Sequence, residues 1–301
     1  MKLLVELPDL IEDTIMVTPA IENLIKHHRG AQITLVGSAV SAKLFEKDVR
    51  ISKVVVEDTS KSIFSLLSLF RTARGLGEQD LVISFKNSFF TKFFMFFVQC
   101  ENKVIYEDIH KDCHNVEKYN EFMNKTLDTD YTAGDLMLRV KPQWFKKPTF
   151  GIHPGSTYAN VKRWPSQEFS KVALALAHKY DIVLLGGKNE IDICEDIENQ
   201  LKENGIENCT NLAGKTSVID LAEKIAALDL FLTIDSGPMQ IAGIYRVNTL
   251  IIPTSYEKIE QRNQWKNPLE TIVYKYIDPY SDEEHKDFTP SAQDVLDLLK
   301  V

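Results

Sequence analysis

Short apolar runs alternate with amphipathic stretches along the first half of the chain. The apolar runs are rich in Val, Ile and Leu, and they predict strands at Lys2–Leu7, Gln32–Val36, Lys53–Val56, Asp80–Ser84 and Lys103–Ile105. Strands that are apolar nearly throughout are typical of parallel sheets buried on both faces. Two intervening stretches predict helices, with Ile21, Leu24, Ile25 and His28 on one face and Ile63, Leu66, Leu67 and Phe70 on another. This alternation predicts βαβ units and a doubly wound sheet.

The pattern breaks at 141–148, where Pro142 and Pro148 bracket a polar stretch, and then begins again. The second half predicts strands at Phe150–His153, Asp181–Leu185, Leu230–Ile234 and Thr249–Ile252, and helices at Gln167–His178, Glu190–Asn204, Val218–Leu228 and Ser291–Leu299. We therefore expect an α/β protein of two Rossmann-like domains, residues 1–141 and 149–301, joined by a linker at 142–148. The last helix is a candidate to pack back on the first domain. Ligands of such sheets bind beyond the carboxyl ends of the strands, here in the interdomain cleft.

Composition narrows the class of protein. The chain has 301 residues and a net charge of −8, which suits two globular domains and disfavours a nucleic-acid binder. The four cysteines form no Cys-x-x-Cys pair, so we expect free thiols and a cytoplasmic protein. The first residues show no signal peptide. The most apolar window, Phe89–Val98, is about half the length that spans a bilayer, so a helix under the first sheet is favoured over a membrane-dipping one.

The segment His153–Pro165 is the first candidate for chemistry. It follows a strand and contains Gly155, Ser156, Thr157, Lys162 and Arg163. Exposed backbone N–H groups, two hydroxyls and two cations form a cradle suited to a diphosphate. The alternative is an ordinary strand-to-helix loop with two solvated cations, and the spacing alone leaves both open.

Two further loops follow strands of the second half. After Leu230–Ile234, the residues Asp235, Ser236, Gly237, Pro238 and Met239 predict a tight turn and a helix start that could hold a second phosphate or a ribose. Helix capping by Asp235 is the competing explanation. After Asp181–Leu185, Gly187 permits close approach of a ligand and Glu190 could accept hydrogen bonds from ribose hydroxyls. A carboxylate favoured by the helix dipole is the alternative there.

Two candidates lie in the first half. Asp13 follows the first strand, near a helix start, and could serve as a general base, although capping alone would also explain it. His110, Cys113 and His114 have a spacing that could place three metal ligands on one helical face. No fourth ligand is evident and the neighbours are charged, so a solvated segment is the favoured interpretation.

Taken together, these motifs resemble glycosyltransferase family 9, the bacterial ADP-heptose–lipopolysaccharide heptosyltransferases, and the heptosyltransferase II type in particular. The resemblance covers most of the chain. It is carried by Asp13 with Thr18-Pro19-Ala20, His153-Pro154-Gly155-Ser156 with Lys162-Arg163-Trp164-Pro165, Asn211-Leu212-Ala213-Gly214-Lys215-Thr216, and Asp235-Ser236-Gly237-Pro238-Met239. Four motifs in the family's order are far more specific than any one of them.

The resemblance implies a GT-B fold and an inverting transfer of heptose from ADP-heptose to the inner core of lipopolysaccharide or lipooligosaccharide. Asp13 matches the general base, and Lys162 matches the cation that stabilises the leaving diphosphate. The matching donor-binding residues are Gly155, Ser156, Thr157, Lys162, Gly187, Glu190, Asp235, Ser236, Gly237 and Met239. No cofactor is expected to be required, Mg²⁺ is not indicated, and peripheral association with the cytoplasmic face of the inner membrane is compatible with the acceptor.

The sequence departs from the family pattern at three positions. Glu12 replaces the usual Gly before the base, Gln240 replaces a frequent His, and Lys92 is the nearest cation to Phe90, where a basic residue is common. Two other functions suit the same architecture. A non-catalytic sugar-binding protein would bind free sugar and ignore ADP, and a nucleotide-sugar 2-epimerase would turn over the donor without an acceptor.

Overall fold

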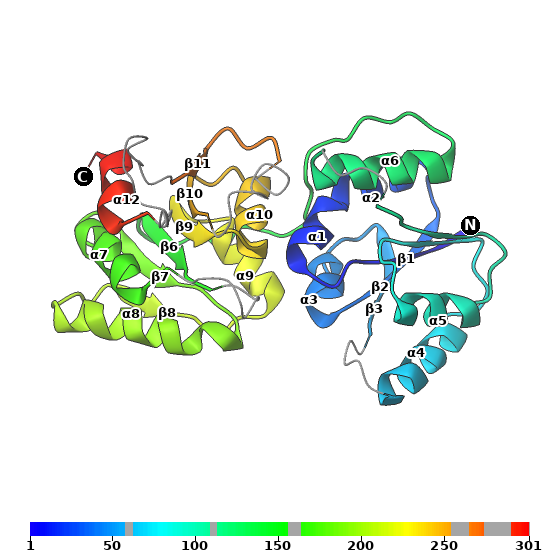
Figure 1. Cartoon of the computed structure of the whole chain (residues 1–301), viewed down its shortest axis with the longest axis horizontal. Helices are drawn as coiled ribbons and strands as arrows, with labels where there is room; N and C mark the ends of the chain where they lie inside the picture. The colour runs from blue at the N-terminus through cyan, green and yellow to red at the C-terminus, as the bar shows by residue number, and fades with distance from the viewer. Residues whose placement is uncertain (58–62, 109–112, 156–163, 254–264, 274–289, 301) are drawn as a thin grey trace, which may run out of the picture. The chain divides into compact units, whose positions relative to one another are not determined.

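The computed structural model describes residues 1–57, 63–108, 113–155, 164–253, 265–273 and 290–300. The chain forms two compact units, Met1–Val140 and Lys141–Val301, each built on its own parallel sheet (Figure 1). Gln143 and Phe145, in the predicted linker, contact the second unit: the Gln143 backbone N–H donates to Glu223 O, and Lys224 lies over the Phe145 ring.

The first unit is a five-stranded parallel sheet in the order β3-β2-β1-β4-β5. The strands are β1 (Lys2–Glu6), β2 (Gln32–Gly37), β3 (Ile51–Val56), β4 (Leu81–Ser84) and β5 (Lys103–Ile105). All five agree with the apolar runs of the sequence. Because the order reverses between β1 and β4, the loops that leave these two strands diverge and make room for a ligand.

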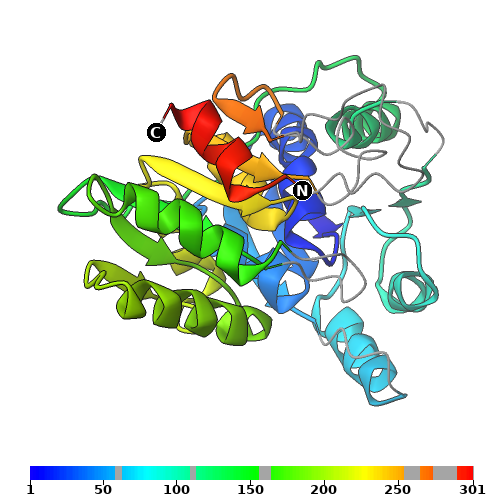
Figure 2. The ribbon, with the colours of Figure 1, turned by 60° about the vertical axis from the view of Figure 1, so that its left-hand side comes forward.

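Helices cover both faces of this sheet. Its helices are α1 (Ile11–Met16), α2 (Thr18–His27), α3 (Ala39–Ala42), the 3₁₀ turn η1 (Lys43–Phe45), α4 (Ile63–Gly75), α5 (Phe89–Phe97) and α6 (Asn115–Leu127). Helices α1, α2 and α6 pack together on one side, and α4 packs with α5 on the other (Figures 1 and 2). The sequence did not predict α6, whose first turn is capped by the His114 ring: Nδ1 accepts from the Val116 N–H at 3.2 Å.

The α4–α5 side confirms one prediction and corrects another. Phe94 and Met95 of α5 are buried with residues of β1 and β4, so the window Phe89–Val98 is a helix packed under the first sheet. Among the α4 side chains that the structure describes, residues 66–75, Leu69 and Ala73 are buried. Leu67 and Phe70, which the spacing placed on one face, are exposed, so these two residues do not belong to the buried face.

The second unit is a six-stranded parallel sheet in the order β11-β10-β9-β6-β7-β8. The strands are β6 (Thr149–His153), β7 (Asp181–Leu184), β8 (Cys209–Asn211), β9 (Leu230–Ile234), β10 (Thr249–Ile252) and β11 (Glu270–Ile272). The sequence did not predict β8 and β11. Each has only three residues, two of them polar, so neither carries an apolar run.

The helices of this unit follow the predicted alternation. They are α7 (Ser166–Leu176), the 3₁₀ turn η2 (Lys188–Glu190), α8 (Ile191–Glu203), α9 (Val218–Ile225), α10 (Gly237–Ile244) and α12 (Ala292–Leu299). Helices α7, α8 and α12 share one core cluster with the sheet, and α9 packs with α10 (Figure 1). Helix α9 begins with a capping box, in which the Ser217 and Asp220 side chains each accept from the other's backbone N–H.

The last helix belongs to the second unit. Val295 of α12 is fully buried in that unit's core, and the Ala292 N–H donates to the Glu168 carboxylate of α7 at 2.6 Å. The buried Trp164 indole donates to Pro290 O, just before α12, at 2.6 Å. These contacts make α12 part of the second unit's core, where it packs on α7.

Candidate active site

Loops with small residues gather at the carboxyl edge of the second sheet. Neighbouring strands β9, β6, β7 and β8 run parallel, so they all end at this edge. The residues that follow them are Ser236-Gly237, Pro154-Gly155, Gly186-Gly187 and Ala213-Gly214. The tertiary structure thus brings together four separate segments of the sequence at the edge where such sheets bind their ligands.

Gly155 and Glu190 are fitted to each other at this edge. Glu190 is buried, and its Oε2 accepts the backbone N–H of Gly187 at 2.8 Å. A Cβ added to Gly155 would lie 1.9 Å from Glu190 Cγ and 2.7 Å from its Oε1. The glycine is therefore required by close approach of a carboxylate, not by its backbone angles. Glu190 does stabilise its own helix start, as the alternative predicted, and that contact fixes the carboxylate beside Gly155.

His153 ends β6 as a buried, neutral side chain. Its Nδ1 lies 3.4 Å from Thr233 Oγ1 of β9, and the hydroxyls of Thr233 and Ser236 both donate to Ile234 O. Because the Thr233 hydroxyl proton is donated to Ile234 O, Thr233 Oγ1 can accept a hydrogen bond from the His153 Nδ1–H. Burial lowers the pKa of His153 to about 4, so the ring carries no charge at neutral pH. Positive charge for a diphosphate must therefore come from other groups.

The start of α10 is oriented toward the same edge. Ser236 stands at the N-cap, and its hydroxyl bonds back to Ile234 O instead of capping the helix. Pro238 lies in the first turn, where its missing N–H costs nothing. Gly237 and Met239 are buried, and Asp235 is half-buried beside them. The N-cap of this helix is Ser236, whose side chain leaves the first backbone N–H groups uncapped, so the helix start is suited to an anion.

Asp13 lies at the corresponding edge of the first sheet. It is half-buried in the first turn of α1, whose N-cap is Leu10, so Asp13 does not cap this helix. Burial raises the pKa of Tyr106, which follows β5, and the charges of Asp108 and Asp13 add to that rise. Asp13 therefore lies within electrostatic reach of the Tyr106 hydroxyl, beyond the carboxyl ends of β1 and β5.

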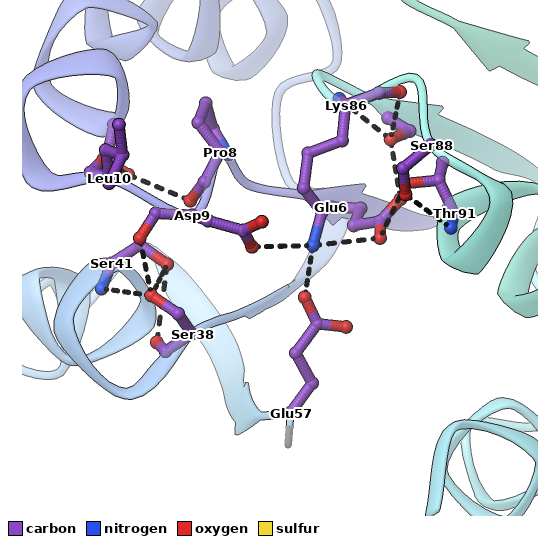
Figure 3. Close-up of polar contacts among 12 residues, drawn as sticks. Glu6, Pro8, Asp9, Leu10, Ser38, Ser41, Glu57, Lys86, Ser88 and Thr91 are labelled. Atoms are coloured by element: carbon purple, nitrogen blue, oxygen red, sulfur yellow. Dashed lines mark hydrogen bonds and ion pairs between the residues drawn. The ribbon is translucent and has the colours of Figure 1, made fainter. Parts of the chain in front are cut away.

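A lysine cluster that sequence reasoning missed lies at the carboxyl ends of β1, β3 and β4 (Figure 3). Lys86, after β4, pairs with Glu6 of β1 at 3.1 Å, with Asp9 at 3.1 Å and with Glu57 after β3. Burial alone would lower the pKa of Lys86, but the three carboxylates outweigh burial and raise it. Burial raises the pKa of Glu57, and Lys86 opposes that rise. The signal in the sequence was Glu6, which interrupts the apolar run from Leu3 to Leu7.

This cluster holds the segment that leads from β1 into α1, the helix that contains Asp13. Lys86 grips the Asp9 carboxylate, Ser38 donates to Asp9 O at 2.9 Å, and Thr14 donates to Pro8 O at 3.1 Å. Three contacts from different elements therefore fix the segment between β1 and α1. A general base needs such a fixed position, because proton transfer depends on hydrogen-bond geometry.

A cavity of about 380 Å³ opens beside Tyr106, between β5 and α6. Its wall combines the rings of Tyr106 and Phe122 with the charged ends of Lys118 and Glu121. Lys118 is buried along most of its length and lies 3.7 Å from Asp108. A cavity with aromatic faces and charged groups of both signs suits a polar, ring-shaped ligand.

Several predicted residues lie outside the described part of the chain. These are Ser156, Thr157, Lys162 and Arg163 of the diphosphate segment, and His110 of the three-residue metal candidate. Within the residues that the structure describes, no group of three His, Cys, Asp or Glu side chains could hold a metal ion. Over the same residues, no helix has the length and apolar character needed to traverse a bilayer.

The family model described as glycosyltransferase family 9 (heptosyltransferase) matches residues 97–249. A lipooligosaccharide heptosyltransferase 2 from Campylobacter jejuni is 33% identical over 285 residues, which cover 91% of this chain and 87% of the relative. The chain belongs to glycosyltransferase family 9. A second relative, the lipooligosaccharide heptosyltransferase 2 of Haemophilus ducreyi, is 24% identical and covers 81% of this chain and 80% of its own. This family-9 protein is accordingly a glycosyltransferase.

Solved structures of family-9 proteins share its fold. A family-9 glycosyltransferase from Veillonella parvula superposes with a TM-score of 0.83 at 19% identity, covering 99% of this chain and 96% of that one. The ADP-heptose lps heptosyltransferase II of E. coli gives a TM-score of 0.78 at 20% identity, covering 100% and 98%. The predicted GT-B fold, with two Rossmann-like units, is confirmed.

The three departures from the family-9 pattern occupy different environments. Glu12 and Gln240 are both buried, Glu12 in the same turn as Asp13 and Gln240 in α10. Lys92 is exposed on α5, on the face turned away from the sheet. The first two positions therefore adjoin the candidate site, whereas Lys92 is part of an outer surface.

Proposed function

We propose that this family-9 glycosyltransferase transfers heptose from ADP-heptose to the inner core of a lipopolysaccharide or lipooligosaccharide, with inversion at the anomeric carbon. The observation that carries the proposal is the 33% identity to a lipooligosaccharide heptosyltransferase 2 over nearly the whole chain. The non-catalytic sugar-binding alternative is not favoured by membership of this family, and neither is the epimerase.

The donor belongs at the carboxyl edge of the second sheet in this proposal. Glu190, fixed beside Gly155, would accept from the ribose hydroxyls, and the start of α10 with Ser236 and Gly237 would face a phosphate. Lys162 and the N–H groups near Ser156 and Thr157 would stabilise the departing diphosphate. The neutral state of His153 supports a role for Lys162, since that histidine supplies no charge. We propose that no metal is required, because a fixed cation and a helix dipole can perform this task.

Asp13 would act as the general base of a single displacement. The acceptor hydroxyl oxygen forms a bond to the anomeric carbon while the bond from that carbon to the diphosphate oxygen breaks. The hydroxyl proton passes to Asp13, and ADP leaves with the electron pair. The cavity beside Tyr106 would receive part of the acceptor, because it opens within electrostatic reach of Asp13. We propose a cytoplasmic protein that meets this lipid-linked acceptor peripherally at the inner membrane.

Two variants test these roles. Asp13→Asn should lower kcat by about 10²–10⁴-fold, because general-base assistance is lost. The Kd for ADP, measured by calorimetry, should stay unchanged. Lys162→Ala should lower kcat by about 10²–10³-fold and also weaken ADP binding, because its charge acts on the diphosphate. The substrates are ADP-heptose and a heptosylated core acceptor, and ADP release is measured.

The matched control is Asp192→Asn, an exposed carboxylate on α8 that should leave kcat unchanged. Near-normal kcat in Asp13→Asn would show that the base is another group. Calorimetry with UDP and GDP tests the donor, and tighter binding of either than of ADP would refute the proposed nucleotide.

A further inference from the structure

The outer face of α4 and α5 is aromatic and basic. On α5, Phe89 is 69% exposed and Phe96 is 77% exposed, with Lys92 between them on the same stripe. The spacing of these three residues is that of one helical face, and it is the face opposite the buried Phe94. Large aromatic side chains of this kind are normally covered, so a patch of them marks an interaction surface.

Helix α4 extends this surface. Leu67 and Phe70 are turned outward, and Arg71 and Arg74 are exposed beside them. The Phe70 ring meets Phe97 of α5 at 4.9 Å, edge to face, so the two stripes are joined. We call this surface the α4–α5 patch. Its residues are Leu67, Phe70, Arg71, Arg74, Phe89, Lys92 and Phe96.

The charge of the patch is opposite in sign to that of the chain. Helices α4 and α5 contain Arg71, Arg74 and Lys92 and no Asp or Glu, whereas the chain has a net charge of −8. None of these three cations forms an ion pair with a carboxylate among the residues that the structure describes. Cations interleaved with exposed aromatic rings are suited to an anionic lipid surface, which attracts the charges and accepts the rings at its interface.

We propose that the α4–α5 patch docks this protein on an anionic lipid membrane. A second copy of the chain is a poorer occupant, because two patches of the same positive charge repel each other. The purpose of docking rests on the proposed function, in which the acceptor is lipid-linked. The patch begins near the carboxyl edge of the first sheet. In the first turn of α5, which starts at Phe89, Thr91 Oγ1 lies 3.5 Å from the Glu6 carboxylate at the end of β1. The segment that leads to Asp13 begins there.

The test is co-sedimentation of the full chain with vesicles of phosphatidylcholine alone or mixed with phosphatidylglycerol. Binding is expected to the phosphatidylglycerol vesicles and to fall in high salt. Phe89→Gln with Phe96→Gln should weaken binding about tenfold or more, because two rings no longer leave water. Arg71→Gln with Arg74→Gln should weaken it by about five-fold per cation.

Matched controls are Trp144→Gln, an aromatic residue that is 78% exposed elsewhere, and Arg29→Gln, an exposed cation after α2. Both should bind vesicles like the unaltered chain. The proposal is overturned if the full chain ignores phosphatidylglycerol vesicles, or if both double variants bind them undiminished. It is also overturned if the patch variants abolish a dimer seen by size-exclusion chromatography while vesicle binding is absent.

Turnover with a deacylated, water-soluble acceptor separates this proposal from the proposed function. The patch variants should retain that turnover, because no patch residue belongs to the candidate active site. If the unaltered chain transfers no heptose, the proposed function is refuted, and the vesicle-binding experiment still tests the docking proposal independently.

Discussion

Gly155→Ala should destabilise the second unit through one identifiable clash. The new Cβ would lie 1.9 Å from Glu190 Cγ and 2.5 Å from its Cδ, far inside van der Waals contact. Glu190 cannot swing aside without cost, because its Oε2 holds the Gly187 N–H at 2.8 Å and the side chain is buried. The substitution therefore forces either a shifted backbone or a broken hydrogen bond.

The magnitude follows from these two outcomes. Overpacking a closely fitted site costs about 1–3 kcal/mol, and loss of a hydrogen bond to a charged group costs about 1.5–3 kcal/mol. Because the chain will relax by the cheaper of the two routes, we expect a loss of about 1–3 kcal/mol. For a unit of this size, that corresponds to a fall in Tm of roughly 2–12 °C.

The assay can be confined to the second unit. The three tryptophans, Trp144, Trp164 and Trp265, all lie in Lys141–Val301, so tryptophan fluorescence during heating reports this unit alone. The matched control is Gly75→Ala, where an added Cβ meets nothing within 4 Å. It should leave the Trp-detected transition unchanged.

A double-mutant cycle makes the argument specific. In a Glu190→Ala background the clash partner is gone, so Gly155→Ala should cost less than about 0.5 kcal/mol. Equal costs in the two backgrounds would refute the assignment of the clash to Glu190. A Tm for Gly155→Ala within about 1 °C of the unaltered chain would refute the reasoning as a whole.

Two further predictions concern charge. Lys86→Met should destabilise the first unit by about 3–5 kcal/mol in urea unfolding followed by circular dichroism, because buried carboxylates lose their cation. The pKa of Glu57 is raised above 4.5 in the folded chain and would rise further without Lys86. As the pH falls toward this raised pKa, Glu57 takes up a proton and no longer needs the cation, so the stability lost in Lys86→Met should shrink. An equal loss at about pH 8 and pH 5 would contradict this prediction. The pKa of His153 falls from 6.5 to about 4 on folding, so the unfolded chain binds the proton first and stability is lost as the pH drops below 6.5. Between about pH 7 and pH 5 the unaltered chain should lose about 2 kcal/mol of unfolding free energy, and His153→Asn should not show this loss. Urea unfolding of both proteins, followed by tryptophan fluorescence, measures the difference.

The sequence determined the architecture because burial leaves a local signature. Strands of a parallel sheet favour apolar runs, and nine of the eleven strands were readable, from Lys2–Leu7 to Thr249–Ile252. The short strands β8 and β11 were missed, since two of the three residues in each are polar. The spacing placed Leu67 and Phe70 of α4 on one apolar face, and both are exposed, because in a helix with several large apolar residues spacing alone does not decide which of them face inward.

The motifs of the site were also visible in the sequence, because tight turns after strands need small residues at fixed spacings. Only the tertiary structure decided what those residues contact. The pairing of Gly155 with Glu190 joins the segments that follow β6 and β7, and the lysine cluster joins Glu6 at the end of β1 with Glu57 after β3 and Lys86 after β4. Such contacts depend on strand order, which no local pattern encodes. The neutral state of His153 likewise required its burial against Thr233, since a pKa reflects the whole surroundings of a group and not its neighbours along the chain.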